Sequence, residues 1–172
     1  MHPISAALMV GGGHRKSADL SRTVLPGDAM PDLKYWWDRL RPLFDELVLV
    51  APAPLEALAW EGLIICGQYH FQAPLAAVRA ALLVAQYEQL LIVDPALQLV
   101  TPEIAAGVAA AAQPRWDVIA LKTDMQTKIV PVMFHKRCLK IMDRHLAQTD
   151  YTMNDFYHQV RLHTMDINAI TH

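Results

Sequence analysis

The chain has 172 residues, 53% of them hydrophobic, and a net charge of −2 with histidine neutral. These values predict one compact domain over residues 1–172, and they exclude a globally positive surface that would recruit nucleic acid or an anionic membrane. No apolar run reaches the roughly 18 residues of a membrane span, and residues 1–10 lack a secretion-signal pattern, so we expect a cytoplasmic protein.

The first predicted element is an apolar strand over residues 4–10, which runs directly into three glycines. Because glycine has no Cβ, backbone N–H groups can converge there on an anion, and basic residues follow. Neither G-x-G-x-x-G nor G-K-[ST] is present, which excludes the dinucleotide fingerprint and the Walker P-loop. A flexible turn after an edge strand is the alternative interpretation. The candidate phosphate-binding segment comprises Gly11, Gly12, Gly13, His14, Arg15, Lys16 and Arg22.

Apolar strands and amphipathic helices then alternate through the middle of the chain. Apolar residues at helical spacing predict a helix from about residue 31 to Phe44. Strands are predicted over 46–51, 62–66 and 88–93, a short helix over 55–59 and a longer helix over 73–87. Thr101 is a predicted N-cap, with Pro102 in the first helical turn of a helix to about residue 112. This alternation is typical of a mostly parallel sheet covered on both faces.

The pattern changes near residue 116. Two β-rich runs, 116–121 and 128–134, have no helix between them, so we expect at least one antiparallel strand. A helix is predicted over 136–147, a weaker helical segment after residue 150 and a closing strand within 160–167. The expected fold is therefore a three-layer α/β/α arrangement. Asp117 is expected to be a turn or surface group, and Cys66 and Cys138 to be buried free thiols.

Ligands of open α/β sheets bind outside the carboxyl ends of the strands. In this sequence the predicted strands lead into segments 11–22, 67–73 and 94–100. We expect these three segments to surround one crevice, where the functional site should lie.

The order of these motifs resembles that of the MobA-like nucleotidyltransferases. In that family the first strand leads into L-A-G-G-x-S-x-R-M-G-x-D-K and then L-P; here V-G-G-G at 10–13 and V-L-P at 24–26 take those places, with Arg22 at the Lys position. A-P-L-A-A at 73–77 is similar to G-P-L-A-G, and V-T-P-E at 100–103 to the end of C-D-x-P-x-L-T-P-E. D-I-N at 166–168 is similar to N-V-N. The resemblance covers almost the whole chain.

The resemblance implies a Rossmann-like nucleotidyltransferase fold that joins GMP from GTP to the phosphate of molybdopterin, with Mg²⁺ as cofactor. It gives Arg22 the catalytic role of holding phosphate, and it suggests Asp94 and Asn168 as metal ligands. The expected partners are the nucleotide and a molybdopterin-type small molecule, and a molybdoenzyme or a cofactor-delivery protein is a further candidate. The implied nucleotide-binding residues are Gly11, Gly12, Gly13, His14, Arg15, Lys16, Pro74 and Leu75.

The chain departs from the family pattern where the chemistry is expected. Alignment on T-P-E places Ala96 at the position of the metal-binding Asp, and an alanine cannot ligate a metal. Asp94, two residues earlier, substitutes for it only if the turn shifts register, and Ala77 replaces the second glycine of G-P-L-A-G. Three hypotheses therefore remain open: an active guanylyltransferase, an inactive relative that serves as a binding or interaction protein, and a cytidylyl- or sugar-nucleotide transferase.

Overall fold

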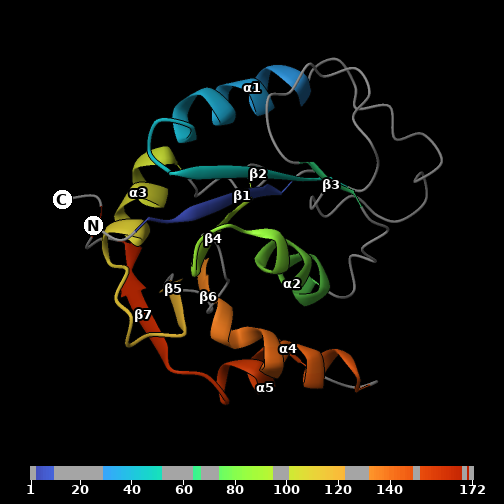
Figure 1. Ribbon diagram of the computed structural model, residues 1–172. Helices are drawn as coiled ribbons and strands as arrows, with labels where there is room; N and C mark the ends of the chain where they lie inside the picture. The colour runs from blue at the N-terminus through green and yellow to red at the C-terminus, as the bar shows by residue number, and fades with distance from the viewer. Residues whose placement is uncertain are drawn as a thin grey trace.

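The computed structural model describes residues 3–9, 29–51, 64–66, 74–94, 101–122, 132–148, 152–167 and 170. Within them the chain forms one seven-stranded sheet with helices on both faces (Figure 1). The strands are β1 (Ser5–Met9), β2 (Glu46–Ala51), β3 (Ile64–Cys66), β4 (Gln89–Val93), β5 (Val118–Lys122), β6 (Val132–His135) and β7 (Leu162–Asp166). The helices are α1 (Ala29–Leu40), α2 (Pro74–Val84), α3 (Pro102–Ala110), α4 (Leu139–Leu146) and α5 (Met153–Tyr157), with a 3₁₀ turn over Lys136–Cys138 before α4.

The sheet is mixed, as the sequence predicts, with the order β3-β2-β1-β4-β6-β5-β7. Strands β1 to β4 are mutually parallel, β6 is antiparallel to β4 and β5, and β7 is parallel to β5. The carboxyl ends of all these strands except β6 therefore lie at one edge of the sheet, which we call the carboxyl edge. The opposite edge is called the amino edge.

Two hydrophobic layers sandwich the sheet and confirm the three-layer arrangement. Trp36 and Leu40 of α1 and Ile104 of α3 pack on one face. On the other face, α2, α4 and α5 contribute a second layer that includes Leu82 and Phe156. Because the central strands are covered on both sides, they form continuous apolar runs in the sequence.

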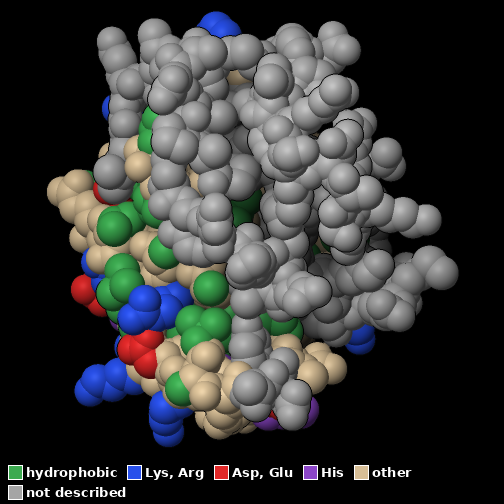
Figure 2. All heavy atoms as spheres, turned by 90° about the vertical axis from the view of Figure 1, so that its right-hand side faces the viewer, with side chains coloured by type: hydrophobic (Ala, Val, Ile, Leu, Met, Phe, Trp, Pro, Cys, Tyr) green, Lys and Arg blue, Asp and Glu red, His purple; other side chains and the backbone are tan. Residues whose placement is uncertain are grey.

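Helices α2 and α4 lie side by side on the second face, where the Arg79 guanidinium donates to the Asp143 carboxylate. Figure 2 views the molecule from the right-hand side of Figure 1 and shows hydrophobic side chains interspersed with acidic and basic ones on its coloured part. Among the described residues, none of the helices is long and apolar enough to cross a membrane.

Helix α1 is shifted toward the N-terminus relative to the prediction. It begins at Ala29, so Pro31 lies in the first turn, where its missing N–H deprives the helix of no hydrogen bond. It ends at Leu40, and the Leu43 N–H bonds the Leu40 carbonyl at 2.9 Å. Phe44 is buried as the periodicity indicates, but it lies beyond the helix.

Helix α2 ends at Val84 rather than at the predicted residue 87. The reason is that side chains of β1 and β2 accept hydrogen bonds from the backbone N–H groups that follow the helix. The Gln86 N–H donates to Glu46 Oε2 at 2.7 Å, and the Tyr87 N–H donates to Ser5 Oγ at 3.2 Å. The buried Ser5 hydroxyl in turn donates to Glu46 Oε2 at 2.5 Å. This network joins β1, β2 and the connection to β4 at the amino edge.

Asp117 is not the surface group that the sequence suggests, since its side chain is only 12% exposed. Its carboxylate accepts from Arg137 Nε at 2.7 Å and from Arg161 Nη2 at 2.7 Å. Arg137 also donates to the carbonyls of Pro114 (2.5 Å) and Trp116 (3.0 Å). The Arg161 hydrogen bond is the main reason that the pKa of Asp117 lies well below its usual range.

Cys138 is a buried free thiol, as predicted. Its Sγ donates to the Asp117 carbonyl at 3.3 Å, and burial raises the pKa of the thiol to about 12. The side chain of Cys66 and the predicted helix over 55–59 lie outside the described residues.

Gly107 in α3 is closely covered by Ile170, near the end of the chain. A Cβ added to Gly107 would lie 2.3 Å from Ile170 Cγ2. We expect Gly107→Ala to destabilise the protein by about 1–2 kcal/mol, because this clash outweighs the helix propensity of about 1 kcal/mol that alanine gains. In an Ile170→Ala background the same change should stabilise by about 0.5–1 kcal/mol. Urea unfolding of the four proteins checks this, and an equal Gly107→Ala effect in both backgrounds would contradict it.

Candidate functional site

The direction in which the chain adds strands to the sheet reverses between β1 and β4. From β1 the chain adds β2 and then β3 on one side, whereas β4 pairs with β1 on the other side. Such a point leaves a crevice outside the carboxyl ends of the two strands, and ligands of open α/β sheets bind there. The fold therefore places the candidate site beside the ends of β1 and β4.

Asp94 is the polar residue that the fold brings to this point. In the β1–β4 register Leu8 is opposite Val93, so Met9 and Asp94 follow at the carboxyl ends of neighbouring strands. Asp94 comes directly after β4 and its side chain is half-buried. Of the two predicted metal ligands, Asp94 thus lies at the expected edge, while Asn168 lies outside the described residues.

The carboxyl edge also carries Lys122 and Asp166, which the sequence reasoning did not select as site residues. They are paired in the parallel register of β5 and β7, and both are exposed. A polar residue that ends an apolar parallel strand is a signal that could have identified both. In the sequence, Asp166 is distinguished only as the first residue of D-I-N.

The remaining predicted site residues divide into two groups. Pro74 begins α2, and the Leu75 side chain is fully buried in the core, so a contact between Leu75 and a nucleotide would use its backbone. Ala77, at the position of the family glycine, is also buried. The other residues lie outside the described part of the chain: Gly11, Gly12, Gly13, His14, Arg15, Lys16, Arg22 and Ala96.

The T-P-E motif forms the helix start that the sequence predicts. Thr101 Oγ1 accepts from the Ile104 N–H at 3.3 Å, and Pro102 is the first residue of α3. Hydrogen bonds from its own backbone N–H and from the Thr101 side chain hold the pKa of the Glu103 carboxyl below its usual value. Within the structure these residues cap α3.

The chemistry of Asp94 fits a hard divalent cation. A carboxylate oxygen is a preferred ligand of Mg²⁺, which keeps several waters and commonly uses one or two carboxylates together with substrate phosphates. In the described ranges, no three His, Cys, Asp or Glu side chains are grouped so that they could hold a metal ion. Asp94 is therefore a candidate ligand for a Mg²⁺ ion whose other ligands would be substrate phosphates and water.

Comparison with known proteins identifies the family. The model of the MobA-like NTP transferase domain matches residues 6–163. The chain belongs to the MobA-like NTP transferase family. It is 22% identical to the molybdenum cofactor guanylyltransferase of Desulfosudis oleivorans, over 96% of this chain and 82% of that protein. It is 27% identical to the probable molybdenum cofactor guanylyltransferase of Carboxydothermus hydrogenoformans, over 99% of this chain and 85% of the relative.

Solved structures agree with the fold of this MobA-like chain. The crystal structure of molybdopterin-guanine dinucleotide biosynthesis protein A from Archaeoglobus fulgidus superposes with a TM-score of 0.69 at 15% identity. The superposition covers 96% of this chain and 84% of the other. The resemblance and the α/β nucleotidyltransferase fold inferred from the sequence are thus confirmed.

Proposed function

We propose that this MobA-like chain is a magnesium-dependent guanylyltransferase that joins GMP from GTP to the phosphate of a molybdopterin-type cofactor. The observation that carries the proposal is the register of β1 and β4, because it puts Asp94 beside the end of the strand that leads into Gly11, Gly12 and Gly13. The guanylyltransferase relatives support the choice of nucleotide and acceptor.

The proposed reaction needs positioning and charge neutralisation more than covalent catalysis. An oxygen of the molybdopterin phosphate attacks the α-phosphorus of GTP. The bond from that phosphorus to the bridging oxygen breaks, and pyrophosphate leaves. In our proposal the backbone N–H groups of Gly12 and Gly13 bind the triphosphate, and Arg22 neutralises the charge that develops on the leaving group.

Asp94 and Asn168 are the residues that we assign to Mg²⁺. When bound, Mg²⁺ supplies electrostatic stabilisation of the phosphates. The side chain of Ala96 has no atom that can ligate a metal, so we assign metal binding to the carboxylate of Asp94, directly after β4.

We expect Asp94→Asn to weaken Mg²⁺-dependent GTP binding by about 10–100-fold, because it removes a charged ligand interaction of about 1.5–3 kcal/mol. Isothermal titration with GTP at saturating Mg²⁺ measures this. Asp38→Asn, the same change at an exposed residue of α1, is the matched control and should bind like the wild type. Equal affinities of all three proteins would remove Asp94 from the site.

The nucleotide itself is tested by titrating the wild type with GTP, CTP, ATP and UTP, with and without Mg²⁺. The proposal predicts micromolar binding that requires Mg²⁺ and prefers GTP. A preference for CTP would favour the cytidylyltransferase hypothesis, and binding of no nucleotide would favour the inactive relative.

The proposed reaction also indicates the compartment in which the protein acts and the class of protein with which it interacts. GTP is a cytosolic nucleotide, so we place the reaction in the cytoplasm. Because the product is a cofactor, we propose that a molybdoenzyme or a cofactor-delivery protein receives it.

A further inference from the structure

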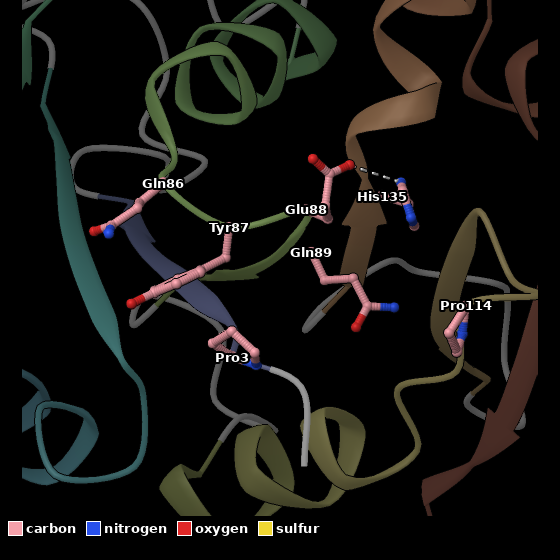
Figure 3. Close-up of a pocket in the computed structure, with 7 residues that line it drawn as sticks. All are labelled: Pro3, Gln86, Tyr87, Glu88, Gln89, Pro114 and His135. Carbon is pink, nitrogen blue, oxygen red and sulfur yellow. Dashed lines mark ion pairs between the residues drawn. The ribbon is translucent and has the colours of Figure 1, made fainter.

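A pocket of about 330 Å³ opens at the amino edge of the sheet. The residues that line it include Pro3, Tyr87, Glu88, Gln89, Pro114 and His135 (Figure 3). Gln89 is the first residue of β4, whereas Asp94 follows the last, so the length of this central strand separates the pocket from the proposed guanylyltransferase site. The pocket is therefore a different site, and its inference does not rest on the proposed function.

Gln89 is the feature of this pocket that points to a ligand. The residue is only 7% exposed, and its side chain extends into the pocket between Pro3 and Pro114 (Figure 3). The carboxamide has no hydrogen-bond partner in the part of the chain that the structure describes. The amide faces the pocket, where it offers two N–H donors and one oxygen acceptor in a single plane.

The side chains that line the pocket disfavour an anion. His135 Nδ1 accepts from the Arg137 N–H at 3.2 Å, so this nitrogen carries no proton, and burial lowers the pKa of the imidazole. The neutral ring faces the Glu88 carboxylate at 3.9 Å, and Glu88 is 74% exposed (Figure 3). Among the described residues that line the pocket, Glu88 is therefore the one charged side chain, and its carboxylate repels a phosphate and can accept from an N–H group.

We propose that this pocket binds an uncharged planar heterocycle that presents a cyclic amide edge, an N–H beside a C=O, to the Gln89 carboxamide. The two amides pair through two parallel hydrogen bonds, which satisfy a donor and the acceptor of Gln89. The apolar faces of Pro3, Tyr87 and Pro114 line the space that the ring occupies. The volume lies at the lower end of the range of about 300–1,000 Å³ for small-molecule sites, which suits a ligand of one or two rings.

A matched pair of probes tests whether the pocket recognises the cyclic amide edge of a ligand. Uracil carries cyclic amide edges, and 1,3-dimethyluracil has the same ring with both N–H groups blocked. In ¹⁵N–¹H NMR titrations we expect uracil to shift the Gln89 side-chain amide signals and the Tyr87 backbone signal, with at least about tenfold tighter binding than dimethyluracil. Equal shifts with the two probes, or none at millimolar concentration, would overturn the proposal and leave ordered water as the occupant.

Two variants make the same test on the protein side. Gln89→Met keeps the length of the side chain and removes the amide, and it should weaken uracil binding about tenfold. Gln159→Met is the matched control, because Gln159 is exposed and is not among the residues that line the pocket. Unchanged uracil binding by Gln89→Met would refute the assignment. If this variant does not fold, the comparison of probes on the wild type decides.

Discussion

Replacing Arg22 with Ala is expected to lower kcat for pyrophosphate release by about 100–1,000-fold. The proposed role of its guanidinium is to neutralise charge on the leaving pyrophosphate, and that charge is greater in the transition state than in bound GTP. The loss should therefore be larger in kcat than in the affinity for GTP. Steady-state assays with GTP, Mg²⁺ and molybdopterin measure both quantities.

Two further variants separate this role from a general effect of charge. Arg22→Lys restores the residue type of the family motif and should recover activity to within about tenfold of the wild type, since lysine keeps the charge but not the bidentate geometry. Arg144→Ala, an exposed position on α4, removes the same group elsewhere and should leave kcat unchanged. A similar kcat for the Arg22→Ala and Arg144→Ala proteins would contradict the assignment.

The second large effect is expected at Asp117, whose replacement by Asn should lower the free energy of unfolding by about 2–4 kcal/mol. The substitution removes the negative charge between Arg137 and Arg161, and it leaves both guanidinium groups beside a neutral amide. Denaturant unfolding checks the value. Asp38→Asn, in an exposed pair with Lys34, should change stability by no more than about 0.5 kcal/mol. Equal effects of the two substitutions would show that the Asp117 cluster does not stabilise the fold.

The stabilisation from Asp117 should depend on pH in a defined direction. The pKa of this carboxyl is lower in the folded protein than its ordinary value of 3.8. Its contribution is therefore fully present above the unfolded pKa and decreases as the pH falls from about 4 toward the folded value. Asp117→Asn should remove this part of the acid-induced loss of stability, and identical pH dependence of mutant and wild type would contradict the mechanism.

Secondary structure was largely predictable here because apolar residues recur along each element with the spacing of a helix or form the continuous run of a buried strand. The apolar run over 46–51 predicts β2 at its observed bounds. The absence of a helix between two late β-rich runs predicts that one of them is antiparallel, and in the structure this strand is β6. The end of α2 could not be predicted in this way. It depends on Ser5 and Glu46, which are distant in sequence and reach the helix end only after the sheet has formed.

The candidate site was predictable to a smaller extent. The position of Asp94 after an apolar strand was sufficient to place it at the carboxyl edge, because parallel strands end on the same side. Pairing of Lys122 with Asp166 requires the register of β5 and β7, which periodicity does not determine. Likewise, nothing in the sequence around Asp117 shows that Arg137 and Arg161 converge on it.

The most direct test of the account is a transfer assay with purified protein, Mg²⁺, GTP and molybdopterin, in which pyrophosphate and the guanylylated product are both quantified. The account predicts equal amounts of the two products, dependence on Mg²⁺ and molybdopterin, and a marked preference for GTP over CTP. If the protein binds Mg²⁺-GTP but forms no guanylylated product, or forms product equally well without a divalent ion, the proposed reaction is contradicted.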